Sequence, residues 1–316
     1  MMPLTPMMPA VDVIIVNWNA GAQLAACVDS IRNYGAPYVA QTIVVDNGSS
    51  DGSTLAVAQY ADTTLLLTGE NLGFGRACNR GAALARSNYL LFLNPDAALY
   101  PDTLSKMVSF MQDDANSTVG ICGAQLLDIS GEIVRSCSRF PSVASFLAQS
   151  IGLDRFLPHA GHIMSEWSHS ETSDVNHVIG ACYLVRRSIF NTLTGFDERF
   201  FLYLEDIDFS YRVVSANWRI TYLATAQAFH VGGGTSSQVK AKRLFYSLRS
   251  RLLYADKHFS RFGSLLVALS TFLLEPISRG LLAILRFSWL NIKEIWSAYC
   301  LLWNWLPRWL FKGLTK

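Results

Sequence analysis

Three carboxylates lie within four residues of one another in the segment 200–209, which reads FFLYLEDIDF. Glu205, Asp206 and Asp208 follow an aromatic and apolar run, where like charges repel one another and lose solvation. Both effects raise a carboxyl pKa toward the range that a general base needs. Acidic residues also suit the first turn of a helix, whose N-terminus favours negative charge. The pattern predicts a helix over 205–215 and makes Glu205 and Asp206 candidates for either role.

A second candidate group, Asn94-Pro95-Asp96, follows the run 89–93, which is too apolar to be exposed. One or two carboxylates together with substrate phosphates are a typical site for Mg²⁺ or Mn²⁺. Asp96 is therefore either a metal ligand or the cap of a helix expected over 101–112. His230, at the end of an extended segment, is either a metal ligand or a buried core histidine.

Two residues near the N-terminus have the chemistry to bind a planar base. The carboxylate of Asp46 can accept a hydrogen bond from a ring N–H, such as N3–H of uracil or thymine. The ring of Trp18 can stack on such a base. An Asx turn or a helix cap explains Asp46 equally well, because it opens the turn-rich stretch DNGSSDGS.

The stretch 71–79 (NLGFGRACN) contains half of a dinucleotide-binding fingerprint. Cys78 replaces the third glycine of GxGxxG, and the stretch does not follow the first strand, so we expect no nicotinamide or flavin site. Gly73 and Gly75 instead predict a backbone that approaches a ligand closely, with Asn79 nearby.

These residues need a framework, and the first part of the chain supplies one. Apolar strand-like runs at 11–16, 42–45, 63–68 and 89–93 alternate with helical patterns at 22–34, 52–60 and 74–86. This alternation predicts an α/β fold with a mainly parallel central sheet, whose ligands bind beyond the carboxyl ends of the strands. Asn17-Trp18-Asn19, Asp46-Asn47 and Asn94-Pro95-Asp96 all follow such ends. Further strands are expected at 119–127, 133–137, 175–186 and 220–231.

The C-terminal part differs in composition from the rest of the chain. Of the 316 residues, 51% are hydrophobic and 16% are charged, below the roughly 25% usual for soluble domains. Residues 1–234 carry 13 Lys and Arg against 21 Asp and Glu, whereas 235–316 carry 13 against 3. Disordered, collagen-like and coiled-coil proteins are therefore excluded, and the acidic body and basic tail predict two different environments.

The tail has the composition of a helix that lies in a membrane interface. Trp289, Trp296 and Trp303 recur every seven residues, which places them on one helical face among basic side chains. The longest uncharged stretches, 262–274 and 295–307, have 13 residues each, fewer than the ~20 that span a bilayer. A buried core helix and a re-entrant hairpin bent at Glu275-Pro276 are the alternatives.

Neither the N-terminal residues nor the cysteine content indicates secretion. The six cysteines form no CxxC pair, so we expect reduced thiols, and 1–10 has no apolar run or basic residue typical of a signal peptide. We expect a disordered N-terminus at 1–10, a catalytic domain at 11–235 and a basic, Trp-rich helical membrane-associating tail at 236–316. The expected location is the cytoplasmic face of the inner membrane, peripheral or monotopic.

Six motifs together resemble family 2 glycosyltransferases, and most closely the bacterial rhamnosyltransferases that extend lipid-linked O-antigen or cell-wall glycans. In order, they are VDVIIVNWNAG, IVVDNGSSDGS, NLGFGRACNRG, LFLNPDA, GFDERFFLYLEDIDFSYRV and AFHVGGGTS. The resemblance covers about 11–235 and implies the GT-A fold, a single nucleotide-binding α/β domain. It also implies an inverting enzyme that uses Mg²⁺ or Mn²⁺.

The resemblance assigns a role to each motif residue. Asp206, beside Glu205, matches the catalytic base; Asp96 matches the last carboxylate of the DXD metal motif, and His230 a histidine that often completes that site. The nucleotide-sugar site would comprise Trp18, Asn19, Asp46, Gly73, Gly75, Asn79 and Asn94. Asn94 stands where many members have the first Asp of DXD, and the QxxRW motif of processive synthases is missing, which favours addition of one sugar.

The implied donor is dTDP-rhamnose, with a UDP-linked hexose or galactofuranose as the alternative, and the acceptor is a lipid-linked glycan at an anionic membrane surface. No nucleic-acid partner is expected. A catalytically idle sugar-nucleotide-binding membrane partner and a nucleotidyltransferase of related topology are the other classes. The second would carry a basic Gly-rich loop after the first strand, where this chain has NWNAGAQ.

Overall fold

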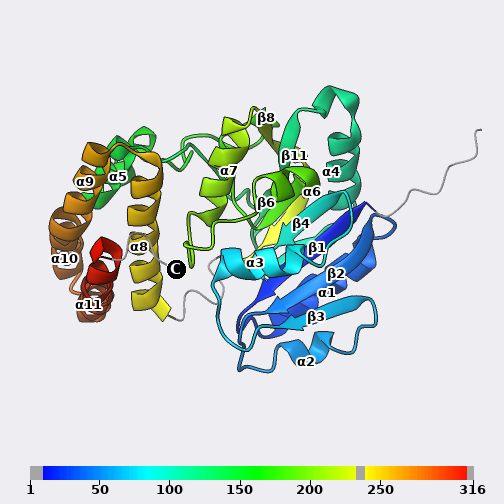
Figure 1. Ribbon diagram of the computed structural model, residues 1–316, viewed down its shortest axis with the longest axis horizontal. Coiled ribbons are helices and arrows are strands. Elements are labelled where there is room, and N and C mark those ends of the chain that lie inside the picture. The colour runs from blue at the N-terminus through cyan, green and yellow to red at the C-terminus, as the bar shows by residue number, and fades with distance from the viewer. Residues whose placement is uncertain (1–9, 233–238, 312–316) are drawn as a thin grey trace, which may run out of the picture.

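The protein consists of a mixed β-sheet covered by helices on both faces and a separate helical unit at one end (Figure 1). The structure is a computed structural model that describes residues 10–232 and 239–311. The expected disorder of 1–9 and the domain boundary at 235/236 lie outside these residues. Ala10, expected to be disordered, is buried and its N–H donates to the carbonyl of Tyr38.

The N-terminal half forms the parallel part of the sheet that the sequence predicts. Strand β1 (Val11–Asn17) lies between β2 (Val39–Asp46) and β4 (Tyr89–Leu93), and β3 (Thr63–Leu67) pairs in parallel with β2. The residues of β1 and β4 are all buried, which explains their continuous apolar sequence. The carboxyl ends of β1, β2 and β4 therefore meet at one edge of the sheet.

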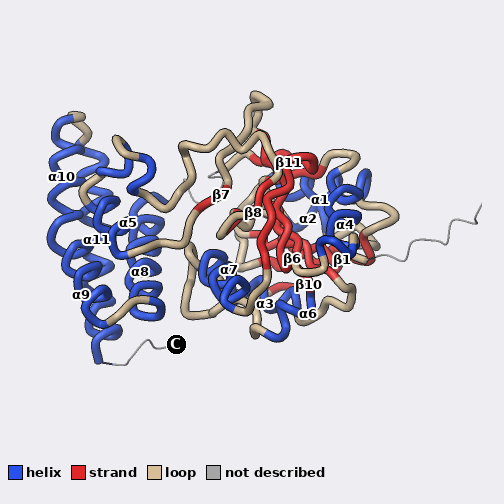
Figure 2. Tube along the Cα trace, turned by 90° about the horizontal axis from the view of Figure 1, so that it is seen from above, coloured by secondary structure: helices blue, strands red, loops and turns tan. Residues whose placement is uncertain are grey.

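The helices of this half lie on opposite faces of the sheet (Figure 2). On one face pack α1 (Ala22–Tyr34), the short α2 (Thr54–Val57) and α4 (Thr103–Gln112). On the other pack α3 (Phe74–Ala82), α6 (Arg187–Thr192) and α7 (Glu205–Ser215). Alternate residues of β1 face the two sides, since Val13 and Ile15 join the first core and Ile14 and Val16 the second.

The second half continues the sheet with both strand directions. Antiparallel β10 (Cys182–Arg186) lies between β4 and β6 (Val119–Leu127), followed by β11 (Arg219–His230) and β5 (Ala97–Leu99), while β8 (Ser173–Asp174) pairs with β11. The expected strand at 175–186 is divided, because Ile179–Ala181 separate β9 (His177–Val178) from β10. The expected strand at 133–137 was wrong: an isolated bridge at Ile133 precedes β7 (Cys137–Ser138), which pairs with β9.

A group of α-helices forms the separate unit at the left of Figure 1. They are α5 (Val143–Ser150), α8 (Lys240–His258), α9 (Arg261–Leu269), α10 (Glu275–Leu285) and α11 (Trp289–Phe311). Its core joins α8 to the N-terminal end of α7, since Tyr254 and Leu253 pack with Phe200 and Ile207. The helical unit is thus attached directly to the segment that carries the candidate base.

No bend occurs at Glu275-Pro276, where the sequence allowed a hairpin. A π-helical turn, Ser270–Leu274, joins α9 to α10, and the widened turn relieves the clash of the proline ring with the preceding carbonyl groups. The hairpin turn lies later, between α10 and α11. Among the described residues, Arg261–Leu285 is the one helix whose 25-residue length and mean hydropathy of 1.5 match a membrane span.

The tryptophans of the tail divide between the surface and the core. Trp289, Trp296 and Trp303, expected on one face, are 81%, 68% and 50% exposed, together with apolar residues of α9 and α10 such as Phe262 and Ile277. Trp305 and Trp309 instead pack against the core of the helical unit. The outer face of this unit is therefore a broad exposed apolar surface, which soluble monomers rarely present.

Candidate functional site

The loops after β1 and β2 are held together by a buried polar cluster. The side-chain amide of Asn17 donates to Asp46 Oδ1 at 2.8 Å and to the hydroxyls of Ser49 and Ser53 at 3.0 and 2.8 Å. Asp46 Oδ2 accepts the N–H of Ser49 at 3.2 Å. Each carboxylate oxygen has two acceptor sites, so Asp46 can still accept a hydrogen bond from a ligand.

Trp18 and Asn19 stand beside this cluster, both half-buried. Asn19 has a left-handed backbone (φ 52°), and its side-chain oxygen accepts the N–H of Ser50 at 2.8 Å. Its own N–H donates to Ser49 Oγ at 3.0 Å. Asn19 therefore joins the β1 and β2 loops and holds Trp18 at the carboxyl edge of the sheet.

The loop before α3 approaches another part of the chain rather than open space. Gly73 has φ 86°, and a β-carbon there would overlap the carbonyl oxygen of Phe201. That carbonyl accepts the N–H of Phe74 at 2.8 Å, and Gly75 packs against Phe196 and Glu205. The close backbone approach predicted from the glycines is present, but it is directed to the 196–205 segment.

Asn79 contacts the same 196–205 segment as these glycines. Its amide donates to the carbonyl of Phe196 at 2.8 Å and to Glu198 at 3.2 Å, and its oxygen accepts the N–H of Phe196 at 2.9 Å. The side chain thus fastens α3 to the segment that leads into α7. Gly73, Gly75 and Asn79, expected at the nucleotide-sugar site, fix the position of the candidate base.

The candidate metal ligands come together at the ends of β4 and β11. Asp96 Oδ1 lies 3.3 Å from His230 Nε2, and Asn94 Nδ2 lies 3.5 Å from the same nitrogen. His230 is 5% exposed, and its Nδ1 has no hydrogen-bond partner among the described residues. Those residues contain no group of three His, Cys, Asp or Glu that could enclose a metal ion. One carboxylate and one imidazole fit a cation that takes its other ligands from a substrate.

The candidate base follows a strained turn. Tyr203 and Leu204 both adopt the left-handed region (φ 68° and 65°), a conformation that non-glycine residues rarely adopt and that is concentrated at functional sites. Helix α7 then begins at Glu205, as the sequence predicts. Glu205 is buried, and burial together with the neighbouring Asp206 raises its carboxyl pKa well above the usual value.

Asp206 is positioned by the segment between β9 and β10. Its Oδ2 accepts the N–H of Gly180 at 3.2 Å and lies 3.6 Å from His177 Nε2, while its Oδ1 accepts the N–H of Ile207. Burial lowers the pKa of His177. Its Nδ1 contacts Ser210 Oγ at 2.9 Å, which fixes the ring. Asp206 keeps 17% of its side chain exposed, so it is oriented by protein groups and still reachable.

One short segment connects the base to the metal candidates. The carbonyl of Ala181 accepts the N–H of Asn94 at 3.0 Å, and the preceding residue, Gly180, donates to Asp206. Asn94-Pro95-Asp96 and Asp206 therefore flank the same two residues. The structure thus links two segments that the sequence separates by 110 positions to one pair of adjacent residues, Gly180 and Ala181.

The third carboxylate of the acidic segment points away from this site. Asp208 is fully buried and pairs with Arg212 at 2.9 Å, Lys257 at 2.6 Å and His258 at 2.7 Å. Although burial alone would raise it, its pKa is lowered by these cations, with the hydrogen bond from His258 foremost. Asp208 therefore attaches α7 to α8.

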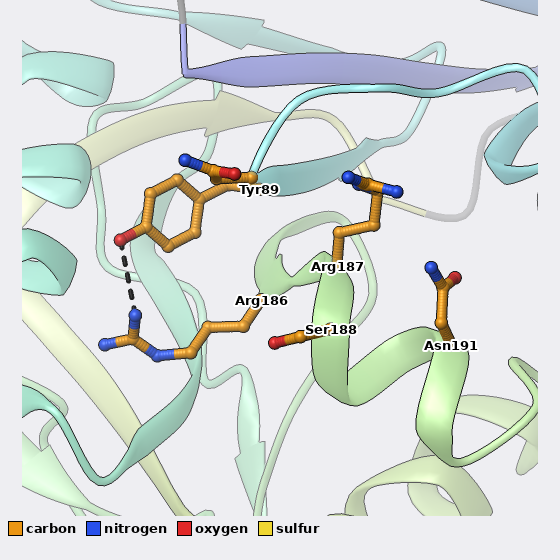
Figure 3. A pocket seen from close by; sticks show the side chains of 6 residues that line it. Tyr89, Arg186, Arg187, Ser188 and Asn191 are labelled. Atoms are coloured by element: carbon orange, nitrogen blue, oxygen red, sulfur yellow. Dashed lines mark hydrogen bonds between the residues drawn. The ribbon is translucent and has the colours of Figure 1, made fainter.

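Two hollows contrast in their relation to the site. One of about 320 Å³ is lined by Asp206, His177, Ser138 and Tyr203 and by residues of α5 and α8. The other, of about 410 Å³, lies around Tyr89 and Arg186 (Figure 3), at the end of β4 far from Asn94. The guanidinium of Arg186 donates there to the carbonyls of Val119, Met111 and Asn116, so it serves the fold.

His177, Ser138 and Tyr203 were missed by sequence reasoning. His177 lies in a mostly apolar run, and only the glycine at 180 marks the break that turns its side chain toward Asp206. Ser138 enters through a two-residue strand with no periodicity to detect. Tyr203, two residues before Glu205, belongs to an aromatic run that the sequence shows, but its left-handed backbone conformation could not be predicted.

Known proteins resemble this chain in sequence and in fold. Residues 12–194, more than half of the chain, match the model of the family described as "Glycosyl transferase family 2". An N-acetylglucosaminyl-diphospho-decaprenol L-rhamnosyltransferase of Mycobacterium tuberculosis is 28% identical over 80% of this chain and 86% of its own length. The rhamnosyltransferase WbbL of Escherichia coli K12 is 26% identical over 63% of this chain and 78% of its own length.

Solved structures share the fold at low sequence identity. The mannosyltransferase PcManGT of Pyrobaculum calidifontis, in complex with GDP-Man and Mn²⁺, is 18% identical with a TM-score of 0.55 and covers 99% of this chain and 84% of its own. TarS 1–349 of S. aureus, in complex with UDP, is 13% identical with a TM-score of 0.54, covering 94% and 91%. The fold is the GT-A fold of these glycosyltransferases.

Proposed function

Because this chain belongs to glycosyl transferase family 2, we propose that it transfers one L-rhamnose from dTDP-rhamnose, with inversion, to a lipid-linked glycan. The observation that carries the proposal is the position of Asp206, oriented but reachable, beside the segment that contacts Asn94. Relatives named as rhamnosyltransferases support the sugar, and one name specifies a diphospho-decaprenol acceptor.

The donor nucleotide would occupy the carboxyl edge of β1, β2 and β4. Trp18 would stack on the base while Asp46 accepts its ring N–H, a group that thymine and uracil share. Asn19 would hold the Trp18 loop and Asn94 would border the sugar. Since the ring N–H does not distinguish the two bases, a UDP-linked hexose is the alternative donor.

A divalent cation, Mg²⁺ or Mn²⁺, would be held by Asp96 and His230 with the donor diphosphate. The Asp96 carboxylate and His230 Nε2, which lie 3.3 Å apart, give an oxygen and a nitrogen donor close together, and a carboxylate with substrate phosphates suits such an ion. When bound, the cation supplies charge stabilisation to the departing nucleoside diphosphate. His230 and Asp96, through the contact with Asn94, hold the diphosphate end of the donor beside Gly180-Ala181.

Asp206 would act as the base. An acceptor hydroxyl that approaches Oδ2 loses its proton to this oxygen while its own oxygen attacks the anomeric carbon from the face opposite the leaving group. The Gly180 N–H and His177 keep the carboxylate oriented during proton transfer. Glu205 would stay buried in the interior and support the start of α7.

The exposed apolar face would hold the protein on the cytoplasmic face of the inner membrane. Helix 261–285 would lie in the plane of the membrane, because Glu275 at its middle is buried in the protein and pairs with Arg251 and Arg279. An apolar groove of about 600 Å³ between α9 and α11 opens on this face. Lys240 and Arg286, around a smaller hollow, would meet anionic lipid.

Nucleotide binding and product analysis test the proposal. Purified full-length protein should be stabilised by dTDP or UDP, and more so with Mn²⁺, whereas GDP and CDP should have weaker effects. A ligand at a hundredfold excess over Kd adds about 2.7 kcal/mol to the free energy of unfolding. Incubation with dTDP-rhamnose and a prenyl-diphosphate-linked sugar should then give one added deoxyhexose by mass spectrometry. Stabilisation by no nucleotide would refute the transferase proposal, and binding without transfer would indicate an idle partner.

A further inference from the structure

The cavity beside Asp206 has walls from two separate parts of the chain. Ser138, His162 and His177, from the loops and strands around β7 and β9, form one side, and Tyr203 leads into α7. The opposite side comes from the helical unit, through Gln149 of α5 and Ser247 and Arg251 of α8. Its volume of about 320 Å³ lies at the lower end of the roughly 300–1,000 Å³ usual for ligand pockets.

Several residues that line this cavity carry a buried polar atom with no hydrogen-bond partner among the described residues. These atoms are Ser136 Oγ, Ser138 Oγ, His162 Nδ1, Tyr203 Oη and Glu205 Oε2. About nine in ten buried polar atoms in folded proteins are paired, so five unpaired atoms in the residues around one hollow need an explanation. Ser138 is 5% exposed and Glu205 is 4% exposed, which excludes bulk solvent as the partner of these two. A ligand with several hydroxyl or amide groups would give these side chains hydrogen-bond partners.

The electrostatics of the lining favour an uncharged ligand. Burial, with Arg251 and His177 nearby, lowers the pKa of His162 to about 4, and burial together with Asp206 raises the pKa of Glu205. The guanidinium of Arg251 is already paired with the buried Glu275. The remaining charge close to the cavity floor is the carboxylate of Asp206. The Asp206 carboxylate would repel a negatively charged ligand. Arg135, the charged residue at the rim of the cavity, is exposed.

We propose that this cavity binds a neutral pyranose of the acceptor, recognised through the hydroxyls of Ser138 and Tyr203 and the imidazole of His162. The proposal rests on the transferase function, and it adds two statements to it. The acceptor sugar is selected against charged sugars, and α5 and α8 form one wall of its site. The C-terminal helices therefore take part in substrate recognition, besides any contact with lipid.

The test removes two oxygen atoms that make no hydrogen bond in the empty protein. In the double variant Ser138→Ala/Tyr203→Phe, a neutral probe should bind about tenfold more weakly, since two hydrogen bonds to the sugar are lost. The control is Tyr254→Phe, which deletes another buried hydroxyl without a partner that does not line the cavity. The probes are the methyl glycosides of N-acetylglucosamine, glucose, galactose and rhamnose, with methyl glucuronide as the charged probe. Ligand-observed NMR measures binding to the full chain with dTDP or UDP and Mn²⁺.

The outcomes separate this proposal from the proposed function. We expect at least one neutral glycoside to bind tenfold more tightly than the glucuronide, with unchanged affinity in Tyr254→Phe. The double variant should unfold at the same or a higher temperature, because no native hydrogen bond is removed. Equal glucuronide binding, equal binding by the double variant, a lower unfolding temperature, or nucleotide binding without binding of any neutral glycoside would overturn the cavity proposal. Glycoside binding without nucleotide binding would instead overturn the transferase proposal.

Discussion

Two neighbouring carboxylates, Asp206 and Asp208, should respond in opposite ways to the same substitution. Asp206→Asn keeps the side-chain shape and an oxygen that can accept the Gly180 N–H, but its amide nitrogen cannot accept the Ile207 N–H, so the free energy of unfolding should fall by only about 1–2 kcal/mol. The amide cannot take a proton at neutral pH. Loss of a positioned general base lowers kcat by about 10²- to 10⁴-fold. Nucleotide affinity should stay within a few fold.

Asp208→Asn should instead destabilise the protein. The fully buried carboxylate pairs with Arg212 and Lys257 and contacts His258, and removal of one member of a buried ion pair costs about 3–5 kcal/mol. Lys257 retains Asp197 at 2.7 Å, so we expect the lower end, about 3 kcal/mol. At ~2–4 °C per kcal/mol, the midpoint of thermal unfolding should fall by about 6–12 °C.

The assay measures unfolding by urea titration and turnover by mass spectrometry on the same samples. Below the unfolding transition, Asp208→Asn should retain most of its activity, whereas Asp206→Asn should be folded and inactive. Loss of nucleotide binding together with turnover in Asp206→Asn would mean that Asp206 is structural or a ligand. Equal stability losses in the two variants would refute the division of roles between them.

Three further predictions concern pH, the α3 loop and the membrane face. The pKa of His162 falls from 6.5 to about 4 on folding, so the unfolded chain binds more protons than the folded chain between these pH values. The free energy of unfolding should therefore decrease as the pH falls through this window. His162→Gln should flatten this pH dependence in urea titrations. Gly73→Ala places a β-carbon against Phe201 at φ 86°, and should lower the free energy of unfolding by about 1–3 kcal/mol in the same titrations. It should also lower kcat, because it displaces the segment before Asp206. An unchanged free energy and an unchanged kcat would show that the loops do not need this contact. The double variant Trp289→Asp/Trp296→Asp should no longer float with anionic vesicles, and its unfolding midpoint should not fall. The control Leu55→Asp, at a similarly exposed position on the catalytic body, should float like the parent protein. Flotation of the tryptophan variant would exclude this face as the membrane contact.

The sequence predicted the framework wherever local patterns are strong. The buried runs of β1, β2 and β4 and the boundaries of α7 were correct because unbroken apolar stretches and helix-start acids are local signals. The strands at 133–137 and 175–186 were wrong or divided, because short strands such as β7 and β9 depend on the partner that the fold brings to them. The antiparallel direction of β10 is likewise set by the whole sheet rather than by its residues.

The site could be nominated from the sequence but not assembled. Residue types and strand ends singled out Asp96, His230 and Asp206, since each follows a recognisable element. The contacts of Gly73 and Asn79 with the 196–205 segment were not predicted, because a glycine indicates that something comes close without identifying it. The raised pKa of Glu205 depends on burial, and the pairing of Asp208 depends on residues more than 40 positions away, neither of which a local pattern contains.

The pairing of Asp208 with Lys257 and His258 also has a consequence for the order of events during synthesis. Domains generally fold as their residues leave the ribosome, N-terminal parts first. The sheet strands up to β11 are complete at residue 230, but the start of α7 gains its cationic partners only with residues 257 and 258. The apolar helices 261–311 follow immediately. The nascent chain therefore completes the contacts between α7 and α8 only when the helices proposed to bind lipid are about to emerge, so full attachment of α7 and the proposed membrane contact become possible at nearly the same moment of translation.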